Sequence, residues 1–425
     1  MIRIFVLSIS FLIFPLFCLS GQDNSICDFA SENVKSVWFE KEDWRITYPV
    51  LTLNSDEQLA LHFDIIDGDY GSLSYRIIHC DRNWNNSDLF ASDYLEGFEE
   101  NRITSYEASF NTTVSYTHYI LRLPNEDIHL KISGNYLVSI YPVGESENPL
   151  LTRRFYVHEG VTNTGVTFRR PMKPGKTESH QQPEITVSTG SLRINDPYRD
   201  VTLSILQNGR PDRAKMNLVP DFVGNGRIEY NSLSDKTLFP GDNEFRFFDI
   251  KTIRQKRQNV RAIEYFTGNY HVFLLPSEDR EFKQYFSSED FNGKYWIAME
   301  ESDTPDRDAD YVYVYFTLPV SAEVKGGSVY VSGAFTDWSY GPLNRMTYNI
   351  SKGSYEAVLL LKQGWYNYEY DFVPDRSGQP EGFYFEGSHY ETENDYLILT
   401  YFRDPTQRYD RLTGATVVNT RGKKE

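Results

Sequence analysis

Short runs of alternating apolar and polar residues, separated by turn-forming residues, recur along almost the whole chain. The clearest is YVYVYFTL at residues 311–318. Similar runs occupy residues 59–64, 74–80, 117–123, 134–143, 151–157, 185–189, 201–207, 244–250, 270–275, 328–332, 355–361, 365–372 and 395–402. A period of two is typical of a strand with one buried face, and the 31 Tyr and 28 Phe residues favour strands. No helical periodicity longer than two turns accompanies them, so the sequence predicts an all-β protein built of sandwiches.

Composition changes divide the 425 residues into three blocks, which agrees with about 100–200 residues per domain. We expect three tandem immunoglobulin-like β-sandwich domains, followed by a disordered tail. The predicted segments are an N-terminal β-sandwich at 34–159, a Pro- and Gly-marked linker at 160–183, a middle β-domain at 184–299, an acidic linker at 300–310, a C-terminal immunoglobulin-like domain at 311–404 and a polar tail at 405–425. In the middle block, Asn208-Gly209 predicts a hairpin.

The first residues predict export from the cytoplasm. Arg3 precedes an apolar run at residues 4–19, and small residues follow it. This is the pattern of a secretory signal peptide, here 1–21, with a leader at 22–33. A lipid-anchored chain starting at Cys18 is the alternative, and the bulky residue before Cys18 disfavours it. No later segment reaches the roughly 18 apolar residues of a membrane-spanning helix, so we expect no direct membrane span.

Two cysteines, Cys27 and Cys80, remain after removal of the signal peptide. In an exported protein they are candidates for one disulfide. The alternative is two separate thiols, one of them in the leader. Two cysteines without suitably spaced histidines are too few for a structural zinc site.

Composition and motifs argue against nucleic-acid binding and against the common enzyme classes. The net charge of −17 is the opposite of a nucleic-acid-binding footprint. The chain has no phosphate-binding loop, dinucleotide fingerprint, nucleophile elbow or zinc-protease motif. The eight histidines are scattered, which leaves only a site assembled from distant positions. Acidic runs at 64–69 and 303–310 lack the spacing of a calcium loop and are predicted to be a turn and a linker. We therefore predict no catalytic residues, no metal and no cofactor.

The third block contains an ordered pattern of aromatic residues and glycines. It comprises residues 333–338 (GAFTDW), 342–346 (PLNRM), 353–357 (GSYEA) and 364–372 (GWYNYEYDF). This order resembles glycogen-binding carbohydrate-binding modules, which implies an immunoglobulin-like sandwich. Those modules stack sugar rings on exposed aromatic residues, and Trp338 stands where one of them lies. The second tryptophan and the lysine of the binders are not evident, and Glu369 occupies the region of that lysine. Trp338 is thus a candidate glycan or partner contact, and a structural or protein-contact role is the favoured interpretation.

Strings spread over the whole chain carry a second resemblance. They include residues 67–70 (DGDY), 79–84 (HCDRNW), 93–101 (DYLEGFEEN), 123–127 (LPNED), 239–246 (FPGDNEFR) and 310–314 (DYVYV). In these strings the chain resembles the type IX secretion system plug protein family of Bacteroidota, for which no catalytic motif is known to us.

This resemblance implies a non-enzymatic role in the periplasm. The plug is expected to close the periplasmic mouth of the outer-membrane translocon barrel when no cargo is engaged, with the barrel protein as its partner. The alternative function is that of an exported glycan-binding protein using the C-terminal module. A polysaccharide pull-down with Trp338→Ala as the control separates the two.

Overall fold

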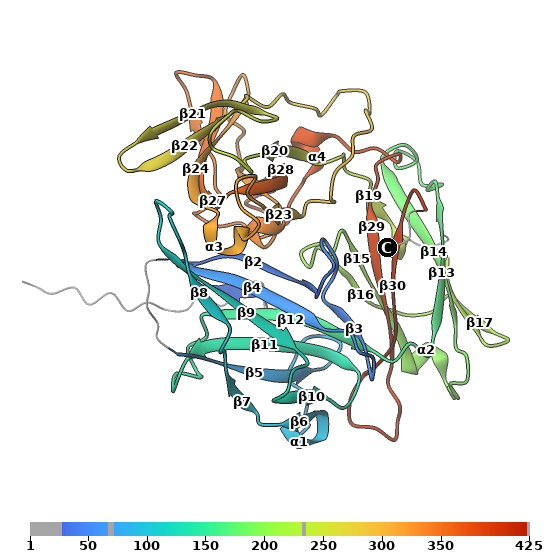
Figure 1. Ribbon diagram of the computed structural model, residues 1–425. Coiled ribbons are helices and arrows are strands. Elements are labelled where there is room, and N and C mark those ends of the chain that lie inside the picture. Colours follow the sequence, from blue (N-terminus) through green and yellow to red (C-terminus); the bar gives the residue numbers. More distant parts are fainter. Residues whose placement is uncertain (1–27, 67–71, 232–234, 423–425) are drawn as a thin grey trace, which may run out of the picture.

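The computed structural model describes residues 28–66, 72–231 and 235–422 and shows a protein built almost entirely of β-strands (Figure 1). The predicted all-β class is confirmed. The helices of the described residues are single turns: α1 (Ala91–Tyr94), α2 (Pro197–Asp200), α3 (Pro305–Asp308), α4 (Phe383–Glu386) and the 3₁₀ turns η1 (Asp235–Thr237) and η2 (Ala334–Thr336). The strands form three sandwiches, each of two facing sheets.

The first sandwich spans β1 to β12 and has its own core. One sheet contains β1 (Phe29–Ala30), β12 (Leu151–His158), β11 (Gly134–Pro142), β5 (Leu73–Cys80) and β7 (Glu100–Arg102), with β3 (Val50–Thr52) beside β12; the other contains β2 (Val34–Lys41), β4 (Leu59–Ile66), β9 (Tyr116–Leu123) and β8 (Tyr106–Ala108); β6 (Leu95–Gly97) and β10 (Ile128–Leu130) form a separate pair. Alternate residues point inward, so Leu61, Phe63, Val138 and Phe155 meet in one buried cluster.

The second sandwich draws its strands from two distant parts of the chain. One sheet contains β13 (Asn163–Arg169), β14 (His180–Ser188), β18 (Arg227–Tyr230) and β17 (Phe222–Gly224), with β19 (Phe239–Pro240) beside β14; the other contains β16 (Lys215–Leu218), β15 (Val201–Gln207), β29 (Asp395–Phe402) and β30 (Arg411–Asn419). Its core joins Ile185, Leu203 and Ile228 to Ile398. The predicted hairpin at Asn208-Gly209 is confirmed, since β15 and β16 pair antiparallel on either side of it.

The third sandwich is formed by the residues between β19 and β29, so it is inserted into the second. One sheet contains β20 (Arg246–Asp249), β28 (Gly364–Pro374) and β23 (Tyr295–Ile297), with β25 (Gly327–Ser332) beside β28; the other contains β21 (Val260–Phe266), β22 (Asn269–Leu274), β24 (Tyr311–Pro319), β27 (Ser354–Lys362) and β26 (Thr347–Asn349). Phe248, Val272, Val314 and Tyr366 lie in its core.

The predicted tandem order and several predicted boundaries are wrong. The segment 160–183 contains β13 and the start of β14, and Pro171, Pro174 and Gly175 lie in the turn between these two strands and not in an interdomain linker. The acidic segment 300–310 lies inside the third sandwich, between β23 and β24, and carries α3. The segment 405–425, expected to be a disordered tail, contains β30, whose backbone pairs with β29.

The three sandwiches pack against one another (Figure 1). The first and second share a hydrophobic cluster in which Cys80, Leu137 and Tyr156 meet Leu206 and Leu397. Inter-domain contacts of this apolar kind restrict relative motion. The chain is therefore organised as one body with three internal cores and apolar or charged contacts between them.

The predicted disulfide joins a residue outside the described part of the chain to a buried one. Cys27, the signal peptide 1–21 and Cys18 lie outside the described residues. Cys80 is fully buried at the end of β5, and burial raises the pKa of its thiol to about 12. The pairing of Cys27 with Cys80 stays a prediction.

The buried His79 predicts a loss of stability in acid. Its Nε2 lies 3.2 Å from the carbonyl oxygen of Ser133, and burial lowers its pKa from 6.5 to about 4. Between these two values the unfolded chain takes up a proton that the folded chain refuses. The free energy of unfolding should therefore fall as the pH drops from 6.5 towards 4, by at most about 1.4 kcal/mol per pH unit from this residue.

Urea unfolding at pH 7, 6 and 5 measures this dependence. His79→Gln should flatten the slope of stability against pH. His129→Gln removes an exposed histidine and should leave the slope at the wild-type value. A His79→Gln slope equal to that of the wild type would contradict the prediction.

Candidate functional site

The outer face of the β2–β4–β9–β8 sheet carries polar side chains, and the third sandwich covers it. Leu61 and Phe63 of β4 point into the core of the first sandwich, so His62 and Asp64 point to the opposite face. The register pairs Asp64 with His118 of β9. Asp64 is fully buried and His118 nearly so. A face of this composition is normally solvated; here it forms a polar seam between two domains.

At the centre of this seam, Asp64 forms an ion pair with Lys362 of β27. The Lys362 Nζ donates to Asp64 Oδ2 at 2.6 Å, and both side chains are fully buried. Tyr311 also donates to Asp64 Oδ2, at 2.7 Å. Lys362 donates a second bond to the carbonyl oxygen of Asp306 at 2.7 Å and lies 4.0 Å from the centre of the Tyr116 ring. These contacts join strands of the first sandwich to strands of the third.

Two opposing effects, burial and ion pairing, determine the pKa values of the charged groups in the seam. Burial raises the pKa of Asp64, but Lys362 and His118 outweigh it, so the pKa lies below its usual value. Burial lowers the pKa of Lys362 more than Asp64 raises it. The lowered pKa of Asp64 favours the ionised pair, whereas the lowered pKa of Lys362 favours the neutral pair. The hydrogen bonds that Asp64 accepts from Lys362 and Tyr311, and the bond that Lys362 donates to the carbonyl oxygen of Asp306, support the ionised form. Burial, together with the nearby His118, lowers the pKa of His62 well below its usual value, which keeps the His62 ring neutral at pH 7.

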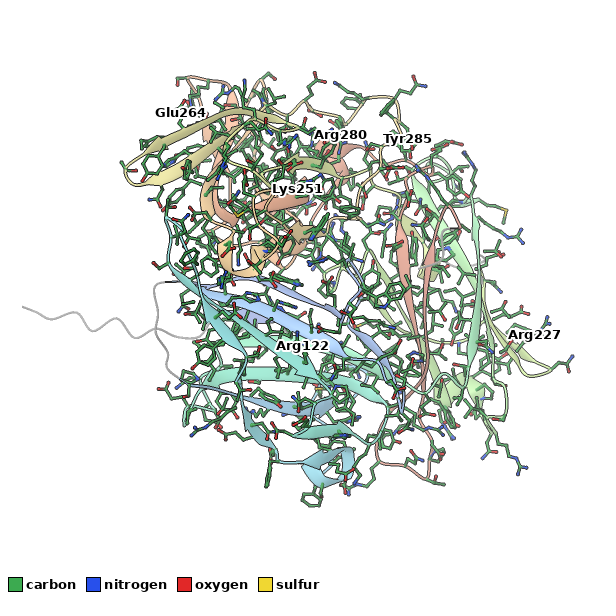
Figure 2. The ribbon with its side chains drawn as sticks, in the orientation of Figure 1. Arg122, Arg227, Lys251, Glu264, Arg280 and Tyr285 are labelled. Carbon is green, nitrogen blue, oxygen red and sulfur yellow. The ribbon has the colours of Figure 1, made fainter. Side chains whose placement is uncertain are left out.

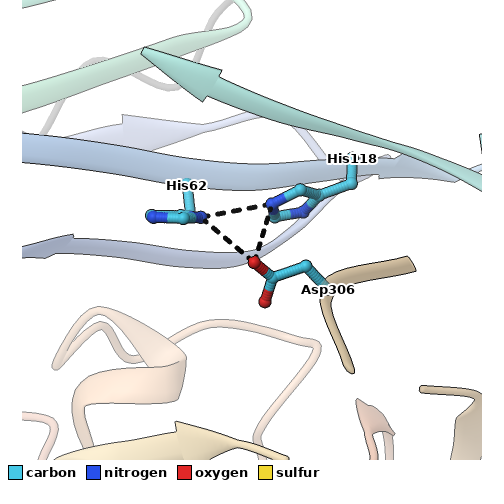
Figure 3. A group of neighbouring side chains, drawn as sticks. All are labelled: His62, His118 and Asp306. Atoms are coloured by element: carbon cyan, nitrogen blue, oxygen red, sulfur yellow. Dashed lines mark hydrogen bonds and ion pairs between the residues drawn. The ribbon is translucent and has the colours of Figure 1, made fainter. Parts of the chain in front are cut away.

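Beside this ion pair, His62, His118 and Asp306 converge (Figure 3). His62 Nδ1 and His118 Nε2 are 3.2 Å apart. The Asp306 Oδ2 lies 3.8 Å from His62 Nδ1 and 3.7 Å from His118 Nε2. Asp306 comes from α3, in the acidic segment that the sequence predicted to be a solvated linker. Within the described residues this is the one group of three His, Cys, Asp or Glu side chains with metal-binding proximity.

The two rings are held in place by their neighbours. His118 donates from Nδ1 to Asp64 Oδ1 at 2.6 Å, and its Nε2 faces His62 and Asp306. The indole of Trp38 stacks on His62 with ring centres 4.6 Å apart and an angle of 10° between the planes. Asp64 thus orients the His118 ring and Trp38 orients the His62 ring, and neither contact involves Asp306.

A second buried charge cluster joins the second sandwich to the third. Arg210, in the β15–β16 turn, is 2% exposed and pairs with Glu369, Asp371 and Asp212. Its Nη2 lies 2.8 Å from Asp212 Oδ2 and 3.5 Å from Asp371 Oδ2. The hydroxyl of Tyr340 donates to Asp371 at 2.9 Å. Glu369, singled out in the sequence as a departure from sugar-binding modules, is here the partner of a buried arginine.

Trp338 belongs to this second cluster and does not form an exposed platform. The residue is 8% exposed, and the Arg210 guanidinium lies 4.1 Å from the centre of its ring. Phe245 contacts it at 5.9 Å between centres. The backbone of Gly293, at φ +80°, approaches so closely that a Cβ there would stand 2.3 Å from the indole. These surroundings favour the structural role over glycan stacking.

The sequence placed His62 and His118 on predicted strands but did not bring them together. A usable signal existed: two predicted strands, 59–64 and 117–123, each with a histidine at an outward position. Recognising the pair required the antiparallel register, and recognising Asp306 required the packing of a third element. The one kind of metal site that the sequence left open was a site assembled from distant histidines. The fold brings two such histidines, His62 and His118, close together.

Comparison with known proteins gives a match to a family model and a solved structure that covers nearly the whole chain. Residues 34–159 match the family model described as "Type 9 secretion system plug protein 1st domain". A crystal structure of a hypothetical protein from Parabacteroides merdae ATCC 43184 superposes with a TM-score of 0.89 at 31% identity, covering 94% of this chain and 100% of that one. No curated protein matches. The predicted resemblance of residues 311–404 to glycogen-binding modules receives no support from these comparisons.

In the described part of the chain, no helix is both long and apolar enough to cross a membrane.

Proposed function

Because this chain belongs to the same family as the solved Parabacteroides merdae protein, and because its first domain matches that of type 9 secretion system plug proteins, we propose that it is a non-enzymatic plug of that system. It closes the periplasmic mouth of the outer-membrane translocon barrel when no cargo is engaged. The plug family is not an enzyme family, and it indicates a periplasmic or extracellular location. The barrel protein is the proposed partner.

The observation that carries this proposal is the match of residues 34–159 to the first domain of the plug proteins, and the packing of the three sandwiches into one body agrees with it. The first domain contacts the second through an apolar cluster and the third through the Asp64–Lys362 pair. Arg153 of the first domain also forms an ion pair with Asp337 of the third. Its Nη2 lies 2.9 Å from Asp337 Oδ1 and 2.8 Å from Asp337 Oδ2. A plug must keep its shape against a wide pore, and a body whose domains contact one another directly is suited to that task.

Exposed aromatic side chains on the first domain suit a reversible protein contact. Phe90 and Phe98 flank α1 and β6 and are 74% and 77% exposed. Aromatic residues dominate the binding energy of many interfaces. We assign this pair to the contact with the translocon. Phe282 and Phe286, exposed on the third sandwich, provide a matched pair for comparison.

Deleting the gene should raise the permeability of the outer membrane to large hydrophilic antibiotics, provided that the translocon barrel is present. Cargo secretion should continue, because a plug is not the conduit. Wild-type protein should restore the barrier, as should the F282S/F286S variant, whereas F90S/F98S should restore it poorly and should co-purify less with the barrel.

Antibiotic susceptibility and dye influx measure the effect in strains with and without the barrel. Unchanged permeability after deletion would overturn the plug function. Full restoration by F90S/F98S would overturn only the assignment of the Phe90–Phe98 contact.

A further inference from the structure

We propose that His62 Nδ1, His118 Nε2 and Asp306 Oδ2 bind a divalent transition metal, with zinc as the best-matched ion, and that this metal ties the first sandwich to the third. The proposal goes beyond the plug function and does not rest on it. It follows from the positions of three donor atoms, the hydrogen bonds around them and their chemistry.

The distances suit a small ion. Three atoms separated by 3.2, 3.7 and 3.8 Å have a common centre about 2.1 Å from each of them, which is the length of a zinc–nitrogen or zinc–carboxylate bond. An ion at that centre therefore requires only small adjustments of the side chains. The histidine–histidine hydrogen bond would be replaced by two metal–nitrogen bonds, with the His62 proton on Nε2.

The surroundings of the donors match those of known metal sites. A metal-bound histidine usually gives its other N–H to a carboxylate, which fixes the ring and strengthens the donor. His118 does this to Asp64 at 2.6 Å. The Trp38 ring holds His62 from the side. Such arrangements distinguish a prepared donor set from a chance approach of three side chains.

Asp306 supplies a further and independent indication. Its Oδ1 is buried and has no hydrogen-bond partner, and its Oδ2 is too far from either histidine for a hydrogen bond. A buried carboxylate oxygen without a partner is costly. A cation at the common centre would compensate this charge. The backbone carbonyl of the same residue accepts from Lys362, so α3 is held at the seam whether or not the carboxylate binds metal.

The ligand types select the kind of metal. Two imidazoles and one carboxylate are typical of zinc and its neighbours among the transition metals, whereas calcium and magnesium take oxygen ligands. The side chains of His62 and Asp306 are 15% and 33% exposed, so solvent reaches one side of the group. A water molecule is the expected fourth ligand there. Since His62 and His118 belong to the first sandwich and Asp306 to the third, the ion would cross-link the two domains.

The test is a zinc titration of the purified, chelator-treated protein carrying a tag without histidines, followed by calorimetry. We expect one Zn²⁺ per chain. Asp306→Asn and His62→Gln should each weaken binding at least tenfold. His129→Gln removes an exposed histidine elsewhere in the first sandwich and should leave the affinity unchanged. Co²⁺ should bind in place of Zn²⁺ with visible absorption bands of low-coordinate cobalt, and Ca²⁺ should not compete.

A second readout guards against misfolded variants. Zn²⁺ should raise the melting temperature of the wild type but not that of Asp306→Asn, because a ligand stabilises only the state that binds it. Circular dichroism checks that each variant keeps its strands. Absence of stoichiometric binding would overturn the proposal, as would equal affinities for the wild type, Asp306→Asn and His62→Gln. Antibiotic permeability does not enter this test, so its outcome is separate from that of the plug proposal.

Discussion

Replacing Lys362 with methionine is expected to lower the free energy of unfolding by about 3–5 kcal/mol, because it leaves the carboxylate of Asp64 buried without its cation. Both side chains are fully buried and 2.6 Å apart. Methionine fills a similar volume, so the loss reports on the charge and not on a cavity. Urea unfolding followed by intrinsic fluorescence measures it, with a chelator present so that metal binding at the neighbouring histidines does not contribute.

Two further variants identify the cause. The double variant D64N/K362M removes both charges and should recover a large part of the lost stability, since the cost lies in the unpaired charge. Lys352→Met removes an exposed lysine that pairs with Glu356 at 2.7 Å, and such a surface pair contributes only about 0–1 kcal/mol. If Lys362→Met cost no more than Lys352→Met, the seam would not stabilise the protein as inferred.

Replacing Arg210 with methionine should also lower the free energy of unfolding by about 3–5 kcal/mol. Three carboxylates, those of Asp212, Glu369 and Asp371, then face one another with Arg213 as the remaining cation within salt-bridge distance of Glu369 and Asp371. The Trp338 ring also loses the guanidinium packed over it. Chemical unfolding measures the loss, and a change from one transition to two would show the second and third sandwiches unfolding separately.

Arg210→Lys keeps the charge but not the planar guanidinium with its paired donors. The stability of this variant should therefore lie between those of Arg210→Met and the wild type. Arg227→Met is the matched control: this arginine is exposed at the outer rim of the second sandwich (Figure 2) and its loss should change stability by less than about 0.5 kcal/mol. An Arg210→Met variant as stable as Arg227→Met would contradict the assigned role of the cluster.

The strands were predictable because their signal is local. The run 311–318 became β24 (Tyr311–Pro319), and 395–402 became β29 with the same bounds. The order of the domains was not predictable in the same way, because pairing between β15 and β29 joins residues almost 200 positions apart. No composition change marks such an insertion. Turn residues at 160–183 looked like a linker because a hairpin turn and a linker use the same residues.

The contrast between Phe63 and Asp64 shows where prediction from sequence ended. Alternation alone determined that the two side chains leave the strand on opposite faces and that Phe63 enters a core. Only the tertiary structure decided that the face of Asp64 is covered by the third sandwich, with Lys362 and Tyr311 brought to it from about 250–300 residues away. Burial inside a sandwich follows from a strand's own period, whereas burial between domains depends on which surfaces meet. The positions of His62, His118 and Asp306 depend on that second choice, so their meeting was decided by the packing of the domains.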